Sequence, residues 1–480
     1  MKHISLLLLV VLIVAGGCAL DPGSEQPSTQ PPPYPENILC ACGDHQLTLS
    51  WDSVPGAGEY NIYMAKYSGL SSTNYEQFIT VGSISYTWTN LSNDRNYYFV
   101  LSSTSSAGEG EHSPELSGMP RDPYSAADLE RLLGSGMYNY DRFGCSVDID
   151  GDHTIMGAWS DDADGYTDRG TAFIFRRTGL NSWEEVAKLA AAEPGGWYEF
   201  GRAVAISGDY AVVGTPRADG LCGSAYVFHR TGGDSWDAGT KLVAPVRVDG
   251  DQFGYSVSIS GDYVVVGLIW RTEAYVFHRT GENSWDSGAE LIAPEGNFGH
   301  TFAIDGDYVV ASSQDAAFVF RRTGLNSWDS GTKLVAPDGG DGFGAPVDID
   351  GYYVIVGAGE QAGSGTAQGA AYVFQRTGVA TWDSGIKLVD PDPGNWNRFG
   401  SSVAISGNYV ITMANGEQKA FAFRRIGPGN TWDGGNELTT PAAGGFAGNS
   451  VAIDGYYGII GASGENTSRG AAYAVYAFPR

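Results

Sequence analysis

The chain is poor in cysteine, in basic residues and in recognisable catalytic motifs. It holds five Cys, seven His and 28 Lys or Arg against 55 Asp or Glu, for a formal net charge of −27. The lack of a basic stripe argues against a nucleic-acid partner and against docking on an anionic membrane. No Gly-x-Ser-x-Gly, His-Glu-x-x-His or phosphate-binding loop occurs. The sequence therefore predicts a protein that is not an enzyme.

An apolar run near the N-terminus predicts export. It covers residues 4–14, too short for a lasting membrane span, and small residues then lead to Cys18. This arrangement resembles the signal of bacterial lipoproteins. The resemblance implies that 1–18 is a signal peptide, that Cys18 is lipidated, and that the protein is anchored by lipid in the cell envelope, at the outer membrane or cell surface. An ordinary secretory signal is the alternative. Residues 19–35, rich in Pro and Ser, are predicted to be a linker.

The chain is rich in glycine, with 68 Gly residues, and it repeats one sequence motif seven times. Each copy has an aromatic residue before Gly or Ala, then Val-x-Ile or a similar apolar pattern, a Ser-Gly or Asp-Gly turn, and a second apolar run. The copies begin at Phe143, Phe200, Phe253, Phe298, Phe343, Phe399 and Phe446. Their spacing of 45 to 57 residues is typical of a propeller or another repeat array.

Each copy is predicted to form four short β-strands. In the third copy, apolar and polar residues alternate over 257–259, a Gly-containing turn follows, and 263–266 runs back. Two further strands are expected at 274–277 and 291–293. Tight turns containing Gly between apolar runs are a strong hairpin signal, and no convincing helical periodicity is present. A four-stranded sheet repeated in this way is a propeller blade.

Spacing alone predicts how the array closes. The last copy ends after its third strand, whereas an unassigned strand, 131–133, precedes the first copy. Arg131 lies 12 residues before Phe143, and Lys188 lies 12 residues before Phe200. We therefore expect 131–133 to pair with residues near 473–478. The predicted fold of 129–480 is a seven-bladed β-propeller closed by an N-terminal strand.

The repeats resemble the FG-GAP repeats of bacterial surface proteins and of the integrin alpha-chain propeller. The Phe-Gly half of the signature stands at six of the seven copies, and the seventh reads Phe446-Ala447. The second half is degenerate, as in Gly157-Ala158-Trp159. The resemblance implies a propeller that is presented for protein–protein interaction or adhesion.

One loop has the spacing of a calcium site. Related propellers carry an Asp-rich loop in the first hairpin of several blades, but here those hairpins are too short to surround a cation. The loop after the second strand of the first copy places its oxygen ligands at alternate positions, with Gly165 at the turn. The candidate ligands of a structural Ca²⁺ are Ser160, Asp162, Asp164 and Asp168. The alternative is an acidic, solvated loop.

Residues 36–119 are predicted to form a separate all-β domain. Leu47, Leu49 and Trp51 alternate along a strand, and Tyr97 stands six residues after Leu91. The pattern resembles a fibronectin type III domain, in which a buried Trp and a corner Tyr recur. Residues 120–128 are expected to link it to the propeller.

Cysteine pairing is left open. Cys145 and Cys222 fall in adjacent repeats and are either partners or separate buried thiols, whereas Cys40 and Cys42 are too close along one strand to pair easily.

Repeated tryptophans are the candidate ligand-binding residues. They stand before the last strand of six copies: Trp183, Trp236, Trp285, Trp328, Trp382 and Trp432. Flat aromatic faces suit sugar rings, but the same positions also suit packing between blades. The leading hypothesis is therefore a surface protein that binds a protein partner, with a carbohydrate-binding propeller as the alternative. A propeller hydrolase using an Asp pair is a third hypothesis, without a motif to support it.

Overall fold

The computed structural model describes residues 30–476 apart from 44, 72, 93–94, 121–128, 180, 194, 270, 297, 340–341, 360–367, 393, 395, 427–428, 439–447 and 449. The signal segment with Cys18, residues 121–128 of the predicted linker 120–128, and the repeat start at Phe446 lie outside the described residues. Contacts divide the chain into two compact units, Met1–Arg121 and Asp122–Arg480. Within the described ranges the protein is all-β, and its only helical turns are η2 (Ala163–Gly165) and α1 (Glu465–Ser468).

Unit 1 is built from two antiparallel sheets. One has the order β1-β2-β5, and the other has the order β4-β3-β6-β7 with β8 also pairing with β6. The strands are β1 (Leu39–Gly43), β2 (Gln46–Ser50), β3 (Glu59–Ala65), β4 (Gln77–Val81), β5 (Ser85–Trp88), β6 (Tyr97–Ser105), β7 (Gly108–His112) and β8 (Leu116–Gly118).

The core of unit 1 lies between these sheets. Trp51 is 4% exposed and packs edge to face on Tyr60, with the ring centroids 5.4 Å apart. The hydroxyl oxygen of buried Tyr97 accepts a hydrogen bond of 2.9 Å from the backbone N–H of Ser92. This bond fixes the chain at the corner before β6, as a tyrosine corner does. Trp51 and Tyr97 thus occupy the structural positions that the sequence predicted.

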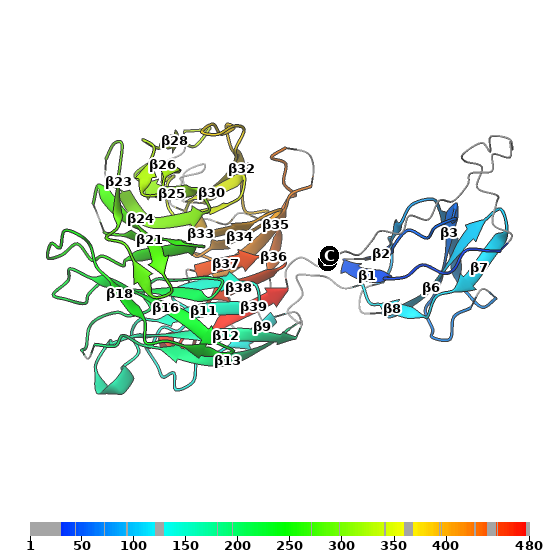
Figure 1. The fold of residues 1–480 in the computed structure, drawn as a ribbon, viewed down its shortest axis with the longest axis horizontal. Coiled ribbons are helices and arrows are strands. Elements are labelled where there is room, and N and C mark those ends of the chain that lie inside the picture. The colour runs from blue at the N-terminus through cyan, green and yellow to red at the C-terminus, as the bar shows by residue number, and fades with distance from the viewer. Residues whose placement is uncertain are drawn as a thin grey trace, which may run out of the picture. The chain divides into compact units, whose positions relative to one another are not determined.

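In the described part of unit 2, the strands form seven sheets, which we number 1 to 7 in chain order (Figure 1). Sheet 1 contains β10 (Val147–Asp150), β11 (His153–Ala158), β12 (Thr171–Gly179) and β13 (Ser182–Leu189). Sheet 2 contains β14 (Val204–Ser207), β15 (Tyr210–Thr215), β16 (Ser224–Gly232), β17 (Ser235–Trp236) and β18 (Thr240–Leu242). Sheet 3 contains β19 (Ser256–Ser260), β20 (Tyr263–Gly267), β21 (Glu273–Gly281), β22 (Ser284–Trp285) and β23 (Ala289–Ile292).

The remaining sheets repeat this order. Sheet 4 contains β24 (Phe298–Asp305), β25 (Tyr308–Ser313), β26 (Ala316–Gly324), β27 (Ser327–Trp328) and β28 (Thr332–Leu334). Sheet 5 contains β29 (Val347–Asp350), β30 (Tyr353–Ala358), β31 (Ala370–Gln375) and β32 (Ile386–Leu388). Sheet 6 contains β33 (Phe399–Ser406), β34 (Tyr409–Ala414), β35 (Lys419–Arg424) and β36 (Asn436–Leu438). Sheet 7 contains β37 (Ser450–Asp454), β38 (Tyr457–Gly461), β39 (Ala472–Tyr476) and β9 (Leu129–Leu132).

The last sheet combines both ends of unit 2. Strand β9 pairs antiparallel with β39, and Leu132 stands opposite Ala472 while Leu129 stands opposite Val475. In Figure 1 the cyan β9 accordingly lies beside the red β39. The expected pairing is present, although the strand covers 129–132 rather than 131–133.

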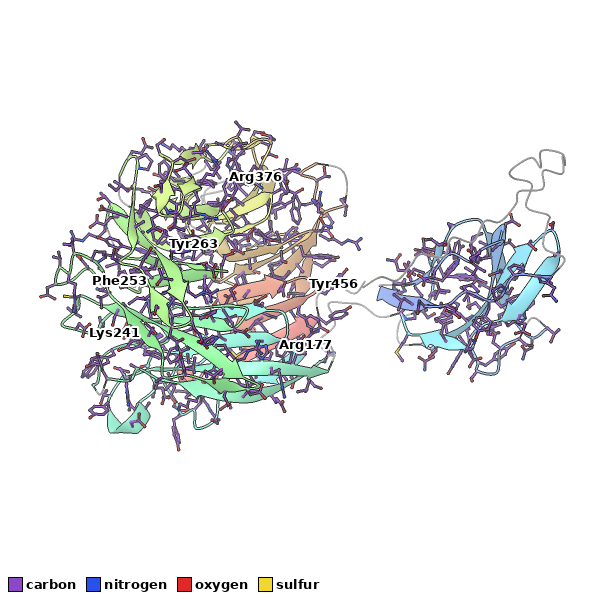
Figure 2. All side chains as sticks on the ribbon, in the orientation of Figure 1. Arg177, Lys241, Phe253, Tyr263, Arg376 and Tyr456 are labelled. Atoms are coloured by element: carbon purple, nitrogen blue, oxygen red, sulfur yellow. The ribbon has the colours of Figure 1, made fainter. Side chains whose placement is uncertain are left out.

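The first strands of the sheets contact one another in sequence. Each first strand contacts that of the next sheet, and β37 of sheet 7 also contacts β10 of sheet 1. The apolar clusters lie between neighbouring sheets: Phe143 of the first repeat is buried with Ile459 and Ala472 of sheet 7. Phe253, labelled in Figure 2, is fully buried in the same way between sheets 2 and 3. Burying such a ring contributes about 2–3 kcal/mol, so the repeated Phe stabilises each interface.

The strand order separates two ends of unit 2. At the turn end, short hairpins join the first strand to the second and the third to the fourth. At the loop end, the connection from the second strand to the third varies from residues 314–315 in sheet 4 to residues 159–170 in sheet 1, and further loops join the fourth strand to the next sheet. Backbone hydrogen bonds connect these loops, as from Trp197 N–H to Thr167 O at 2.7 Å and from Gln252 N–H to Leu221 O at 3.0 Å.

Candidate functional site

The first strands of the seven sheets surround a pocket of about 310 Å³ that is lined by carboxylates and hydroxyls. The last residue of each strand forms its rim: Asp150, Ser207, Ser260, Asp305, Asp350, Ser406 and Asp454. Each rim side chain accepts a hydrogen bond from the backbone N–H of a Gly in the next sheet's turn. Gly351 donates to Asp305 at 2.7 Å, and Gly455 donates to Ser406 at 3.0 Å.

The Ser-Gly or Asp-Gly turn explains this rim. Gly455 has φ of +56°, a conformation that residues with a Cβ adopt at a cost. That conformation presents its N–H to Ser406, so one dipeptide supplies both the turn and the contact between sheets. The rim side chains therefore serve a structural role, because each accepts a hydrogen bond that joins two sheets.

Two further carboxylates line the pocket deeper in the strands. Asp148 accepts hydrogen bonds from the N–H groups of Ile149 and Ile206 at 2.9 and 2.8 Å. Asp348 is bound in the same way by Ile349 and Ile405. Burial raises the pKa of each carboxyl to about 7, although these hydrogen bonds act in the opposite direction. Both residues belong to the lining of the pocket, and a pKa of about 7 would let each carboxyl change charge near neutral pH.

The six repeated tryptophans lie at the contacts between sheets near the turn end. Trp183 and Trp432 are buried, and the other four are half-buried against the apolar clusters. Trp285 of sheet 3 packs edge to face on Tyr210 of sheet 2, with ring centroids 6.3 Å apart. Trp183 packs in the same way on Tyr457 of sheet 7. These positions leave little of the indole face for a sugar ring, and sugar binding by these residues stays a prediction.

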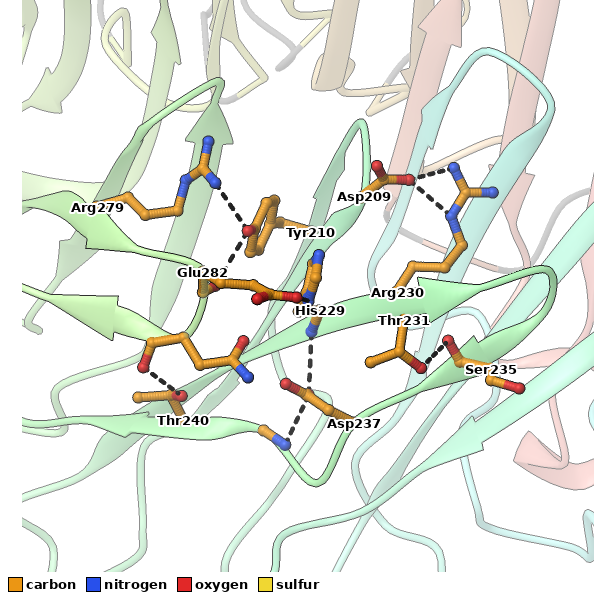
Figure 3. Close-up of polar contacts among 12 residues, drawn as sticks. Asp209, Tyr210, His229, Arg230, Thr231, Ser235, Asp237, Thr240, Arg279 and Glu282 are labelled. Atoms are coloured by element: carbon orange, nitrogen blue, oxygen red, sulfur yellow. Dashed lines mark hydrogen bonds and ion pairs between the residues drawn. The ribbon is translucent and has the colours of Figure 1, made fainter.

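A second repeated contact joins the same sheets (Figure 3). The guanidinium of Arg279 lies 4.4 Å from the centre of the Tyr210 ring and donates a hydrogen bond of 2.8 Å to its hydroxyl. The same group pairs with Asp262 in its own sheet. The hydroxyl of Tyr210 in turn donates to the Glu282 carbonyl at 3.0 Å. The equivalent contact of Tyr263, labelled in Figure 2, is with Arg322.

His229 and His278 belong to this contact region. Their positions, filled by Arg or Gln in other repeats, predicted surface residues. The His229 ring instead stacks on Tyr210 at 4.7 Å, and its side chain is only 13% exposed. Because Tyr210 and Tyr263 stand directly opposite His229 and His278 on the neighbouring strand of the same sheet, these imidazoles pack as structural residues.

The predicted calcium loop is held by contacts within the protein. The Ser160 hydroxyl donates to Asp168, whose backbone N–H donates to Asp162 Oδ1 at 2.9 Å. Asp164 forms an ion pair with Arg169, and Arg169 also donates to the Ala191 carbonyl at 2.7 Å. No group of three or more acidic, His or Cys side chains suited to a metal ion occurs in the part of the chain that is described. Asp164 is thus paired with a guanidinium, and a structural Ca²⁺ at this loop stays a prediction.

The loop end carries exposed aromatic side chains that the sequence analysis missed. Tyr140, Trp197 and Trp396 are 64%, 60% and 63% exposed. Each precedes a repeat Phe by three residues and has a φ between +62° and +77°. Non-Gly residues held in this strained region concentrate at functional sites. The signal that identifies them is an aromatic residue at a fixed distance before Phe-Gly, in three of the seven copies.

Two arginines near the first strands flank an aromatic ring at the same end. The guanidinium groups of Arg142 and Arg202 each lie 5.5 Å from the centre of the Trp159 ring. Arg202 also donates to the Tyr255 hydroxyl at 3.2 Å. Among the described residues, neither arginine forms an ion pair with a carboxylate. Cation–π contacts therefore place positive charge on this face of a strongly acidic protein.

Cys145 and Cys222 are free thiols and do not pair with each other. Burial raises the pKa of the Cys145 thiol to about 11, which favours the protonated thiol at neutral pH. In the described part of the chain, no helix has the length and apolar character needed to cross a membrane.

Comparison with known proteins finds one matching family and several solved structures with partial similarity. Residues 127–175, 183–228, 236–277 and 328–374 match the FG-GAP repeat. The crystal structure of FN3tt is 25% identical over 19% of this chain and 97% of its own, with a TM-score of 0.17. A Fn3-like protein from Clostridium thermocellum is 28% identical over 18% of this chain and 90% of its own, also with a TM-score of 0.17. No curated protein matches the chain. The chain thus contains FG-GAP repeats and has FN3-like structural neighbours.

Proposed function

We propose that unit 2 is a seven-bladed β-propeller closed by β9, and that the protein is a non-enzymatic surface protein whose loop end binds a protein partner. Two contacts between sheets 7 and 1 support closure, the pairing of β9 with β39 and the hydrogen bond from Gly151 to Asp454. The FG-GAP repeats suggest interaction or adhesion. The observation that carries the proposed function is the set of exposed, strained aromatics at the loop end. Tyr, Trp and Arg dominate the energetics of protein interfaces.

The test compares the two ends of the propeller. Beads coated with the full-length protein are presented to cell envelopes. Binding is compared between Trp197→Ala/Trp396→Ala and a control at the turn end, Leu325→Ala/Val379→Ala, whose side chains are equally exposed. We expect the loop-end variant to lose attachment by about tenfold or more at unchanged melting temperature, and the control to retain it. Equal attachment by both variants would reject the proposal that the loop end binds the partner.

Carbohydrate binding is the second candidate, favoured by the open indole faces of Trp197 and Trp396. A glycan array separates the two functions. Saturable glycan binding that disappears in Trp197→Ala would assign a sugar ligand, whereas attachment without any glycan signal supports a protein partner.

We further propose that the protein is exported and anchored by lipid on Cys18. Cys18→Ala should abolish labelling by a radioactive fatty acid and release the protein from membranes. A signal peptide of the ordinary secretory type predicts no labelling in either form.

A further inference from the structure

A pocket at the loop end lies where the two termini of unit 2 meet. It has a volume of about 450 Å³ and is lined by Met137, Tyr138, Asn139 and Arg469. The first three residues lie between β9 and β10, and Arg469 directly follows α1. Tyr138 is 74% exposed and Met137 is buried, so the pocket combines an aromatic rim with an apolar wall. Asn139 and Arg469 supply hydrogen-bond donors.

Arg469 has an unsatisfied donor at this pocket. Its Nε is buried and has no hydrogen-bond partner within the described residues. The nearby carboxylate of Glu465 is already used, because one oxygen pairs with Arg131 and the other accepts from the Tyr473 hydroxyl at 2.6 Å. The buried Nε is not reached from the pocket, so a ligand there would be bound by the terminal Nη groups of Arg469, which form no ion pair with a carboxylate among the described residues.

Strained backbone holds Arg469 in place. Asn466, Thr467 and Ser468 have φ values of +49°, +59° and +59°, three consecutive non-Gly residues in the left-handed region. The N–H of Tyr140 donates to Thr467 at 3.2 Å, and that of Arg142 donates to Ser468 at 2.9 Å. Consecutive left-handed residues are uncommon for L-amino acids, and such strain concentrates at ligand clamps.

We propose that this pocket binds the carboxylate of an acidic side chain on a protein partner. The inference rests on the proposed function, because it names the chemistry of the partner that the loop end recognises. Arg469 donates to the carboxylate oxygens, the Asn139 amide donates a further bond, and Tyr138 with Met137 packs on the aliphatic stem. Among the described residues Arg469 forms no ion pair with a carboxylate, and a positively charged donor of this kind selects an anion. The Tyr, Met and Arg composition favours a protein over a sugar acid, because these residues are enriched at protein interfaces.

The test uses the full-length protein and a small probe in place of the partner. Saturation-transfer NMR measures binding of N-acetylglutamate, with N-acetylglutamine as the uncharged probe of equal size. We expect binding of the first only, and about tenfold weaker binding in Arg469→Gln. Tyr138→Ser, at an exposed position that tolerates change, should weaken binding about threefold. The control is Arg247→Gln, because Arg247 lies at the same end but pairs with Asp219 at 2.9 Å.

Several outcomes overturn the proposal. Equal binding of both probes, no change in Arg469→Gln, or an equal loss in Arg247→Gln means that the pocket does not select a carboxylate. If Arg469→Gln fails to fold, Tyr138→Ser becomes the deciding variant. Unweakened binding of N-acetylglutamate to Tyr138→Ser then rejects the proposal that the probe binds in this pocket. Tighter binding of a methyl uronide that depends on Arg469 assigns a sugar acid instead. Probe binding without bead attachment rejects only the proposed function, whereas attachment without probe binding rejects only this pocket.

Discussion

The backbone N–H of Gly151 donates a hydrogen bond of 2.7 Å to the carboxylate of Asp454, 303 positions along the chain. The same interface contains a bond of 2.9 Å from Val147 N–H to Ser450 Oγ. Both bonds repeat contacts that join other neighbouring sheets, such as Gly351 to Asp305. Because the bond between the first and last sheets has the same form as the internal ones, the seam between the ends is expected to be as stable as the other interfaces.

The closing strand gives the first prediction. Leu132 of β9 is 3% exposed, and Leu242 of β18 holds the equivalent position in sheet 2 at 5%. We expect Leu132→Ala and Leu242→Ala each to lower the free energy of unfolding by about 2–4 kcal/mol, because both remove a packed isobutyl group. Calorimetry of the full chain, following the transition of unit 2, measures both. If Leu132→Ala left the free energy of unfolding unchanged while Leu242→Ala lowered it, β9 would not be paired with β39 in solution.

The pocket carboxylates make stability depend on pH. Asp148 and Asp348 keep their protons up to about pH 7 in the folded state, whereas an Asp in the unfolded chain loses its proton near pH 4. Between these values the unfolded state binds fewer protons, so the free energy of unfolding falls as pH rises. Allowing for screening by water in the pocket, we expect it to be on the order of 1–2 kcal/mol lower at pH 8 than at pH 5.

Neutral variants test the origin of this slope. Asp148→Asn and Asp348→Asn carry no titrating proton and should flatten the pH dependence, while the loss of one acceptor oxygen costs about 1 kcal/mol at low pH. Asp305→Asn at the rim is the control and should leave the slope unchanged. Equal slopes in the wild type and the double Asn variant would contradict the assignment.

The order of strands was predictable from the sequence, whereas most of the candidate site was not. Repeated Phe-Gly pairs and Ser-Gly or Asp-Gly turns act locally, so spacing alone located the hairpins and the partner of β39. The pocket at Arg469 depends on contacts between residues near 138 and 468, which no local pattern encodes. The burial of His229 likewise depends on Tyr210 of its own sheet and Glu282 of the next. Such contacts appear only when neighbouring sheets are packed.

The repeated tryptophans yield a stability prediction rather than a binding one. Trp285 packs on Tyr210 and on the apolar cluster between sheets 2 and 3. Trp285→Ala should lower the free energy of unfolding by about 2–3 kcal/mol, and Trp285→Phe by about 1 kcal/mol, because Phe restores most of the contact. Binding to envelopes should be unchanged in the folded fraction of either variant. A loss of glycan binding at unchanged stability would instead support the sugar-binding interpretation.

The loop that contains Asp164 allows a direct test of whether the protein binds Ca²⁺. Arg169 pairs with Asp164, so we expect millimolar CaCl₂ to leave the melting temperature of the wild type unchanged relative to EGTA. Arg169→Met keeps the volume but removes the charge, leaving Asp162, Asp164 and Asp168 to repel one another. This variant should be less stable by about 1–3 kcal/mol and should regain part of that in calcium, because a ligand bound only by the folded state stabilises it. Arg247→Met controls for the general loss of positive charge. Stabilisation of the wild type by several degrees would show that the loop rearranges around Ca²⁺, as its spacing of oxygen ligands predicts.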